Sequence, residues 1–206
     1  MEKTFFAKRL AHLLLGKKDL DRLSKVQFHQ SYAYEDFVQG YRPVDDGKFG
    51  HVDGSFMQFC DQALQDPSSP YVLLINEIKR GNLSKIFGEL LLLIGADKRS
   101  ETWATKLIYS KEGESPFDVP KNLCITGTMN TSNRSLAMVD YALRHRFAFF
   151  DVPPVFGQPS FFRKITSLGV ESALSDRIVS HLQYLNARIC GDPNLGDEFR
   201  LGHSYF

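Results

Sequence analysis

Residues 71–82 read YVLLINEIKRGN, and this stretch decides the expected fold. Its first five residues form a continuous apolar run of strand length, which is typical of a strand covered on both faces in a parallel sheet. Asn76 and Glu77 end the run with polar side chains. The runs at 123–128 (LCITGT) and 147–152 (FAFFDV) are also mainly apolar and of strand length, so we predict two further buried strands there.

Helical patterns separate these runs along the chain. Apolar residues at Phe6, Leu10, Leu13 and Leu14 recur at helical spacing. The pattern also predicts helices at 56–65, 83–94, 135–143 and within 159–188, a short strand at 26–29, a loop at about 40–54, and a small hairpin from 103–109 and 117–119. Because strands and helices alternate, we predict a parallel α/β sheet with right-handed crossovers.

Composition narrows the class of protein. The chain has 206 residues, 43% of them hydrophobic, which suits one domain or a domain and a half. Twenty-five basic residues oppose twenty-four acidic ones, and the net charge of +1 disfavours a free-standing nucleic-acid-binding module. The longest apolar run, at 90–94, is far shorter than the roughly 20 residues that a membrane span needs.

The cysteines and a tyrosine-rich turn have plain structural interpretations. Three cysteines lie far apart without metal-ligand spacing, which suits a reducing cytoplasm, and Cys124 is expected in the core because it lies in an apolar run. An aromatic and basic mixture can stack nucleic-acid bases, but a tyrosine-rich turn is expected to pack locally against the sheet instead. The residues concerned are Tyr32, Tyr34, Phe37 and Tyr41 with the basic Arg42, Lys79 and Arg80.

Polar side chains follow two of the expected strands where each strand ends. Asn76 and Glu77 follow one strand, and Asn130 follows another. Ligands of open parallel sheets bind at the carboxyl ends of the strands. In nucleotide hydrolases one such side chain helps to hold a magnesium ion and the next orients or deprotonates water, a role that Glu77 fits. Taken alone, the dipeptide fits equally well a polar cap of a strand at the surface.

Four ordered blocks carry a resemblance to a known family. They read VQFHQSYAYEDFVQGYRP (26–43), YVLLINEIKRGNLSKIFGELLLLI (71–94), GTMNTSNRSLAMVDYALRHRFAFF (127–150) and FRLGHSYF (199–206). In this order they resemble the McrB-like, GTP-dependent motor subunits of modified-cytosine restriction systems, which are AAA+ proteins. The resemblance implies an α/β fold, the three-layer sandwich of P-loop NTPases with a parallel sheet, at residues 1–153. It also implies the start of a helical lid at 154–206.

The resemblance implies a nucleotide site with magnesium. Lys3 and Thr4 match the last two residues of the phosphate-binding loop, in which the lysine reaches the β- and γ-phosphates and the hydroxyl ligates Mg²⁺. Asn76 and Glu77 stand where the family has an Asp-Glu pair at the end of a strand. Asn76 occupies the position that faces the metal ion, and Glu77 occupies the position of the catalytic acid. GTP or ATP is implied as the substrate.

A second group of implied site residues lies in the block at 127–150. Asn130 matches the residue that positions the attacking water, and Asn133 and Arg134 complete the nucleotide-binding block. Arg144 and Arg146 match an arginine cluster that reaches a neighbouring subunit's nucleotide, since a guanidinium fork suits developing phosphoryl charge. Members of the family form a ring, usually hexameric, that drives a McrC-like endonuclease partner along DNA.

The sequence departs from the family at the phosphate-binding loop. Only Met1 and Glu2 precede Lys3, so we expect a chain cut within this loop and lacking most of the backbone amides that hold phosphates. The strand that feeds the loop would precede residue 1. Its absence would leave 123–128 and 147–152 without a neighbour, and we therefore expect the chain alone to be poorly stable.

Two acidic positions of the family carry amides, at Asn76 and Asn133. An amide keeps the shape of a carboxylate but removes the charge that faces magnesium or an arginine, which favours slow or absent hydrolysis. The leading hypothesis is a fragment of an AAA+ NTPase motor subunit. The alternative is a hydrolysis-deficient remnant or assembly subunit of the same family.

Overall fold

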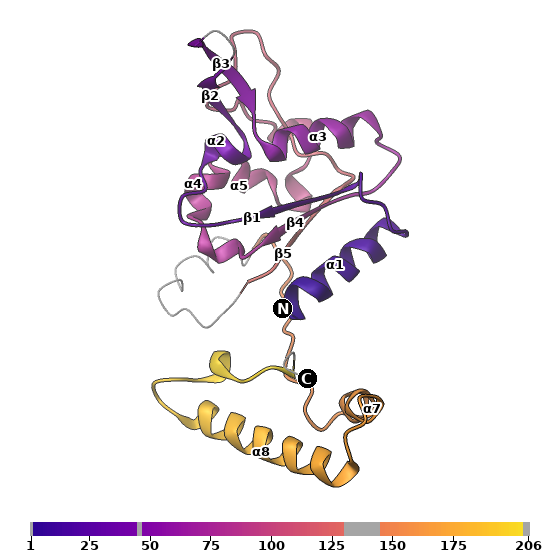
Figure 1. The fold of residues 1–206 in the computed structure, drawn as a ribbon. Coiled ribbons are helices and arrows are strands. Elements are labelled where there is room, and N and C mark those ends of the chain that lie inside the picture. Colours follow the sequence, from indigo (N-terminus) through magenta and orange to yellow (C-terminus); the bar gives the residue numbers. More distant parts are fainter. Residues whose placement is uncertain (1, 45–46, 130–144, 204–206) are drawn as a thin grey trace. The chain divides into compact units, whose positions relative to one another are not determined.

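A computed structural model of the chain describes residues 2–44, 47–129 and 145–203 (Figure 1). These residues divide into two compact units, one formed by Lys3–Phe149 and the other by the chain from Phe150 onward together with the extreme N-terminus. The two units are described separately. Asn130, Asn133, Arg134 and Arg144, and the helix expected at 135–143, lie outside the described residues.

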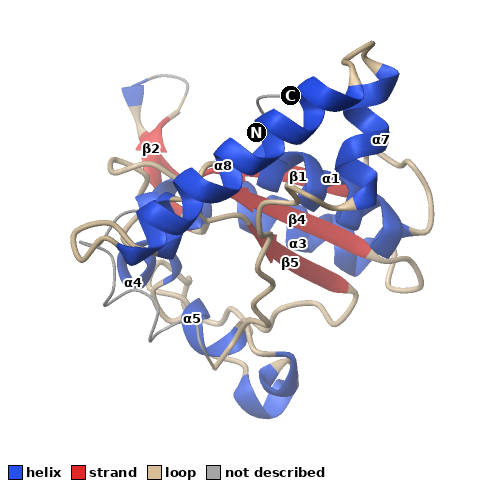
Figure 2. Cartoon of the chain, turned by 90° about the horizontal axis from the view of Figure 1, so that it is seen from below, coloured by secondary structure: helices blue, strands red, loops and turns tan. Residues whose placement is uncertain are grey.

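The first unit is built on a parallel sheet of three strands. β1 (Leu23–Gln27), β4 (Tyr71–Asn76) and β5 (Leu123–Gly127) lie side by side in the order β1-β4-β5 (Figure 2). Leu23 pairs with Val72, and Tyr71 pairs with Leu123, so all three strands end at one edge. The predicted parallel α/β sheet is therefore confirmed, and β1 begins three positions before the expected strand at 26–29.

Both faces of β4 are covered, which explains its unbroken apolar sequence. α1 (Glu2–Leu15) packs Ala7, Ala11 and Leu15 onto one face, against Leu23, Val72 and Leu74. Leu73 and Ile75 point to the opposite face. There they contact the main core, built around α2 (Tyr34–Phe37), α3 (Ser55–Gln65), α4 (Leu83–Phe87) and α5 (Leu90–Leu93). Alternate side chains of one strand thus fill two separate cores.

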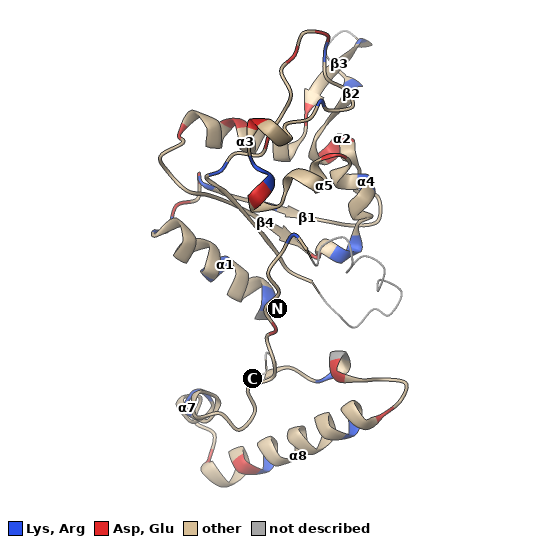
Figure 3. Cartoon of the chain, turned by 180° about the vertical axis from the view of Figure 1, so that it is seen from behind, with Lys and Arg blue, Asp and Glu red and all other residues tan. Residues whose placement is uncertain are grey.

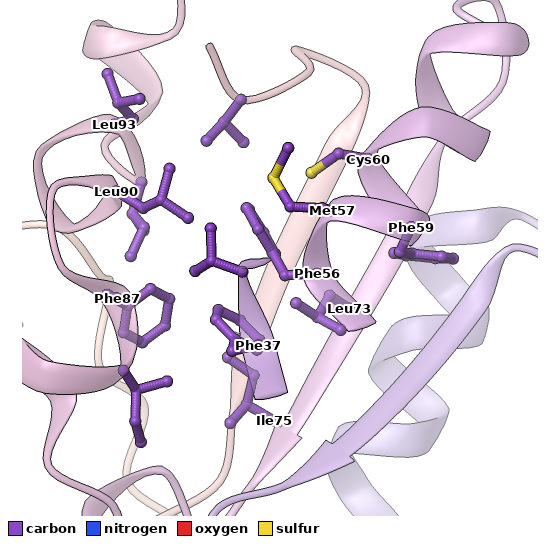
Figure 4. Packing of buried hydrophobic residues seen from close by; sticks show 14 of the residues in the cluster. Phe37, Phe56, Met57, Phe59, Cys60, Leu73, Ile75, Phe87, Leu90 and Leu93 are labelled. Carbon is purple, nitrogen blue, oxygen red and sulfur yellow. The ribbon is translucent and has the colours of Figure 1, made fainter. Parts of the chain in front are cut away.

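Aromatic rings pack among aliphatic side chains in the main core (Figure 4). Phe37 stacks on Phe56 with ring centroids 4.9 Å apart, and its ring also meets Phe87 edge-on at 5.0 Å. Tyr34 and Phe37 are buried here, and Tyr32 packs against the same core. The expectation of local packing is confirmed for Tyr32, Tyr34 and Phe37, whereas Tyr41 is 53% exposed.

Glycine breaks the helix expected at 83–94. α4 ends at Phe87, and Gly88 follows with φ of 51°, a left-handed conformation that glycine adopts readily. A Cβ atom on Gly88 would lie 2.9 Å from the ring of Tyr34. After the break, the Glu89 carboxylate accepts hydrogen bonds from the Tyr34 hydroxyl (2.6 Å) and the Ile108 amide (2.9 Å).

Two other segments also differ from the expectation. The loop expected at 40–54 is an antiparallel hairpin of β2 (Gln39–Pro43) and β3 (Phe49–Asp53). The hairpin expected from 103–109 and 117–119 is reduced to a single bridge between Thr105 and Phe117. The described part of this unit also contains short 3-10 helices at Ile78–Arg80, Ala96–Lys98 and Glu101–Trp103.

The strand expected at 147–152 is absent from the described structure, and this prediction is wrong. These residues are irregular, and Phe150 is 79% exposed. None of the described strands pairs with this segment, so it lacks the backbone hydrogen bonds that a strand in a sheet forms. The expected core position of Cys124 is also wrong, because its side chain is exposed. It shares a sheet face with Val72, but α1 covers only the β1 and β4 part of that face.

The second unit is helical. α7 (Pro159–Ser167) and α8 (Ser172–Gly191) are separated near Gly169, whose φ is 83°, and a 3-10 helix follows at Asp197–Phe199. A small core of Phe156, Phe161, Ile165 and Val179 holds this unit together. The Asn186 side chain exchanges two hydrogen bonds with the backbone of Leu201, at 3.1 and 2.8 Å, which fixes the segment after α8.

Candidate functional site

The candidate site lies where β4 and β5 end. The ladder between the strands continues past both ends, since the Thr128 amide donates to Ile75 O (2.9 Å) and the Ile78 amide donates to Thr128 O (2.9 Å). These bonds hold the turn after β4 against the end of β5. Asn76 and Glu77, which are 52 and 51 positions from Thr128 in sequence, are thereby brought beside it.

The Thr128 hydroxyl joins the two polar residues that close β4. The hydroxyl oxygen accepts a hydrogen bond from the Glu77 amide at 3.2 Å, and the hydroxyl group donates its own hydrogen to Asn76 Oδ1 at 3.4 Å. Thr128 is buried and both bonds are partly buried, so they link the Glu77 amide and the Asn76 side chain to the end of β5. Sequence reasoning assigned no role to Thr128. The rule that found Asn76, a polar residue at the end of an apolar strand, also applies to Thr128.

Glu77 has an unusual backbone. Its φ of 53° and ψ of 46° are left-handed, and no other described residue except glycine has a positive φ. For a residue with a Cβ this conformation costs about 1–2 kcal/mol, and such strain is typical of functional positions. The carboxylate forms an ion pair with Arg80 Nε at 3.3 Å. Because both side chains are partly exposed, this pair is weak and leaves the carboxylate accessible.

Lys3 reaches the same edge of the sheet from α1. The packing of Ala7, Ala11 and Leu15 fixes the helix on the sheet, and Lys3 lies in its first turn. Its ammonium group donates a hydrogen bond to Met129 O at 3.1 Å, one residue after Thr128. Thr4, the next residue of the helix, is exposed. A cation, a carboxylate, an amide and a hydroxyl therefore lie around the ends of β4 and β5.

Of the other predicted site residues, the structure describes only Arg146. Arg146 is half-buried in a turn at 145–147, next to the exposed His145. Four further residues of the predicted site, which are Asn130, Asn133, Arg134 and Arg144, lie outside the described residues. Lys79, which follows Glu77 and Ile78, is buried and is not a surface residue.

The oxygen atoms at this edge fit the chemistry of magnesium. Asn76 and Glu77 offer an amide oxygen and a carboxylate at the end of β4, and Thr4 offers an exposed hydroxyl in the first turn of α1; these are hard ligands of the kind that Mg²⁺ prefers. Among the described residues, no three His, Cys, Asp or Glu side chains gather into a metal-binding group. A sparse protein ligand set suits Mg²⁺, which usually keeps several waters and binds substrate phosphates.

Within 2–44, 47–129 and 145–203, no helix is both long enough and apolar enough to span a membrane.

Comparison with known proteins identifies the larger part of the chain. The family described as AAA domain (dynein-related subfamily) matches residues 1–147.

Two relatives are subunits of restriction enzymes. The chain is 49% identical over 205 residues to the type IV methyl-directed restriction enzyme EcoKMcrB subunit of Escherichia coli (strain K12), covering 99% of this chain and 44% of that protein. It is 26% identical over 128 residues to the type II restriction enzyme BsuMI component YdiS of Bacillus subtilis (strain 168), covering 58% of this chain and 37% of that protein. The chain thus spans less than half the length of both relatives.

Proposed function

The chain belongs to the AAA domain family, dynein-related subfamily, and from this premise we propose that it is the nucleotide-hydrolysing part of a restriction-system motor. The proposed reaction is hydrolysis of GTP or ATP in the presence of magnesium. The observation that carries it is the convergence of Lys3, Glu77 and Asn76 at the ends of two parallel strands, linked through Thr128 and Met129 O.

The proposed roles follow from the chemistry of each group. Lys3 binds the phosphates as a point charge, and Thr4 and Asn76 supply oxygen ligands to magnesium. When bound, the metal ion offsets charge that develops on the phosphoryl oxygens. Glu77 orients the attacking water or accepts its proton, and Asn130 helps to place that water.

The remaining proposed roles concern the rim of the site and a neighbouring subunit. Asn133 and Arg134 contribute to nucleotide binding, and Arg144 and Arg146 act on the nucleotide of an adjacent subunit. A guanidinium group is suited to this task because its planar fork matches phosphoryl oxygens. We further propose that residues 1–153 form the nucleotide-hydrolase core and residues 154–206 the beginning of a helical lid.

The proposed assembly is a cytoplasmic ring, hexameric by family, that works with a McrC-like endonuclease subunit. In this proposal, DNA is engaged through the assembled complex rather than by this chain alone. The identity of 49% to the EcoKMcrB subunit supports a motor for modification-dependent restriction.

A second candidate function is an assembly subunit that binds nucleotide without hydrolysing it. The observation that favours it is the neutral Asn76, whose Oδ1 is already engaged by the Thr128 hydroxyl. An amide so engaged is a weaker magnesium ligand than a carboxylate, because it brings no net charge to the metal ion. This candidate shares the binding site with the first and differs from it only in turnover.

Titration of the chain with fluorescent GTP and ATP analogues and Mg²⁺ tests binding, and phosphate release tests turnover. Lys3→Ala is expected to weaken binding at least about tenfold, because it removes the charge facing the phosphates. Lys8→Ala is the matched control, since Lys8 is an exposed lysine on the same helix. Equal affinities of the two variants would contradict the proposed site.

Glu77→Gln separates the two candidates. If the chain hydrolyses nucleotide, this variant is expected to retain binding and to lose turnover by about 100-fold or more. Binding without measurable phosphate release in the unaltered chain would support the assembly subunit instead. The same titrations, run with GTP and ATP in parallel, identify the preferred base.

A further inference from the structure

Thr128 holds the turn after β4 through three separate groups. Its backbone amide donates to Ile75 O at 2.9 Å, and its backbone carbonyl accepts from the Ile78 amide at 2.9 Å. Its hydroxyl oxygen accepts from the Glu77 amide at 3.2 Å, a bond that lies outside the backbone ladder. Together the three bonds attach the chain before Glu77, the chain after it and the Glu77 amide itself to the end of β5.

A close approach of the two segments reinforces this attachment. Ile78 is 3% exposed and belongs to the main core, which holds the residue after Glu77 in place. Gly127 precedes Thr128, and a Cβ atom on it would lie only 3.1 Å from Ile78 Cδ1. Because glycine has no side chain, the end of β5 can lie directly against the turn, and the Thr128 hydroxyl comes within reach of the Glu77 amide.

The backbone of Glu77 requires support of this kind. A left-handed conformation, with φ of 53°, is unfavourable for a residue that has a Cβ atom. A hydrogen bond to a buried hydroxyl contributes a free energy of similar size, and Thr128 is buried. The bond and the strain are therefore close to balance. Loss of the hydroxyl is expected to let Glu77 return to an ordinary negative φ.

The backbone, more than charge, determines where the Glu77 carboxylate lies. Its ion pair with Arg80 Nε, at 3.3 Å, joins two partly exposed side chains and is weak. Basic and acidic side chains are interspersed over the described chain in Figure 3, and the net charge is +1, so no strong field of one sign acts on the carboxylate. Its position depends mainly on the direction of the Cα–Cβ bond, which the conformation of residue 77 sets.

We propose that Thr128 is the positioning residue for the Glu77 carboxylate. Its hydroxyl maintains the left-handed conformation of Glu77 and thereby keeps the carboxylate where it orients the attacking water or accepts its proton. This inference rests on the proposed hydrolysis, because it assigns Thr128 a role in that reaction. The hydroxyl therefore contributes to turnover much more than to nucleotide affinity.

Kinetics of threonine variants test this role. Thr128→Val removes the hydroxyl at constant shape, and it is expected to lower kcat at least about fivefold while the Kd of nucleotide with Mg²⁺ changes less than about twofold. Thr128→Ser restores the hydroxyl and is expected to recover most of kcat. Thr126→Val is the matched control, because the half-buried Thr126 of β5 forms no hydrogen bond through its hydroxyl with a described residue.

Two kinetic outcomes would overturn the proposal. An unchanged kcat in Thr128→Val would show that the hydroxyl supports the fold without positioning the carboxylate. A loss of nucleotide affinity as large as the loss of turnover would show that the hydroxyl supports the whole site rather than Glu77.

A double-mutant cycle tests whether Thr128 acts through the carboxylate. In the Glu77→Gln background, Thr128→Val is expected to change the residual single-turnover rate less than about twofold, because the carboxylate that it positions is already gone. The same fold loss as in the unaltered chain would also contradict the proposal, since Thr128 would then affect the reaction independently of Glu77.

NMR of the full chain provides a readout that needs no turnover. A positive φ brings the amide and Hα protons of one residue unusually close, so Glu77 is expected to give a strong cross-peak between them. Thr128→Val is expected to weaken this cross-peak about twofold or more, whereas Thr128→Ser and Thr126→Val retain it. Thr128→Ala is a second variant without the hydroxyl, for use if the valine variant does not fold.

The NMR comparison also keeps this inference distinct from the proposed function. Absence of phosphate release from the unaltered chain would contradict the proposed hydrolysis, and the cross-peak of Glu77 would then decide whether Thr128 holds its conformation. A cross-peak of full strength in the folded variants without the hydroxyl would overturn the role of Thr128, whether or not the chain hydrolyses nucleotide.

Discussion

β4 and β5 carry the same sequence pattern but are packed differently. Each is a mainly apolar run followed by polar residues. From Tyr71 to Ile75 every residue of β4 is buried, whereas in β5 only Leu123 is buried and Cys124 is exposed. β4 has a strand on both sides and packed helices on both faces, while β5 is the last strand of the described sheet. The apolar pattern thus predicts a strand, whereas the strands and helices packed beside it determine how deeply that strand is buried.

Matched truncations in the two strands give the largest expected effect. Leu73→Ala in β4 is expected to lower the free energy of unfolding by about 3 kcal/mol, because Leu73 is fully buried and its removal leaves a cavity. Ile125→Ala in β5 is expected to cost about 1 kcal/mol, because Ile125 is only half-buried. Urea unfolding followed by the fluorescence of Trp103, the single tryptophan, reports this unit. Equal losses would show that β5 is buried as deeply as β4.

Cysteine labelling compares the accessibility of Cys60, in the core beside β4, with that of Cys124 in β5. Cys60 is fully buried in the core beside β4, and burial raises the pKa of its thiol. The thiolate is the reactive form, so a raised pKa lowers reactivity at a given pH, and burial blocks access as well. With a thiol reagent at pH 8, Cys124 is expected to react about 100-fold faster than Cys60.

Peptide mapping by mass spectrometry assigns each labelled cysteine. Cys190 serves as the exposed comparison from the helical unit. Its thiol pKa is raised, chiefly by the hydrogen bond with Asp197, so its labelling is expected to increase as the pH rises from 7 to 9. Rapid labelling of Cys60 under native conditions would contradict the closed core on that face of the sheet.

Removing the link between the strand ends has a smaller expected effect. Thr128→Val leaves the Glu77 amide and Asn76 Oδ1 without their shared partner, and it is expected to cost about 1.5 kcal/mol of stability. Thr126→Val is the matched control, because Thr126 is a half-buried residue of β5, two positions before Thr128, whose hydroxyl forms no hydrogen bond with a described residue. Urea unfolding measures both, and a similar small change in the two variants would show that the Thr128 hydroxyl contributes nothing specific.

The sequence was sufficient for the strands that are fully covered. Tyr71–Asn76 was found almost to the residue, because burial on both faces leaves an unbroken apolar run. The sequence of the β2–β3 hairpin predicts a loop, since Gly40, Pro43 and Gly50 interrupt its alternation. The segment at 147–152 was read as a strand because its composition fits one, although no described strand lies beside it.

The sequence indicates which described residues lie at the candidate site, but not the hydrogen bonds that connect them. Asn76, Glu77 and Lys3 were each found from local patterns or resemblance. The hydrogen bonds of Thr128 depend on the register between two strands about 50 positions apart, and no local pattern specifies that register. The break at Gly88 has a similar origin, because it depends on the approach of the Tyr34 ring.

The end of β4 is strained whereas the end of β5 is not, and this contrast gives the smallest expected effect. Glu77 is left-handed, with φ of 53°, while no residue from Leu123 to Met129 has a positive φ. Glu77→Gly relieves this strain, and after the extra entropy of glycine in the unfolded chain is subtracted it is expected to stabilise the unit by about 0.5–1 kcal/mol. Glu77→Gln is the control, because it removes the carboxylate and keeps the strained backbone.

Comparison of these two variants separates the backbone from the charge. Both are expected to lose the proposed hydrolysis, because neither retains the carboxylate. Only Glu77→Gly is expected to gain stability in urea unfolding, which would mean that the strain is maintained to aim the carboxylate at the edge of the sheet. If Glu77→Gly is instead less stable than Glu77→Gln, the left-handed conformation carries no cost, and the packing of the side chain at position 77 matters more than the backbone geometry implies.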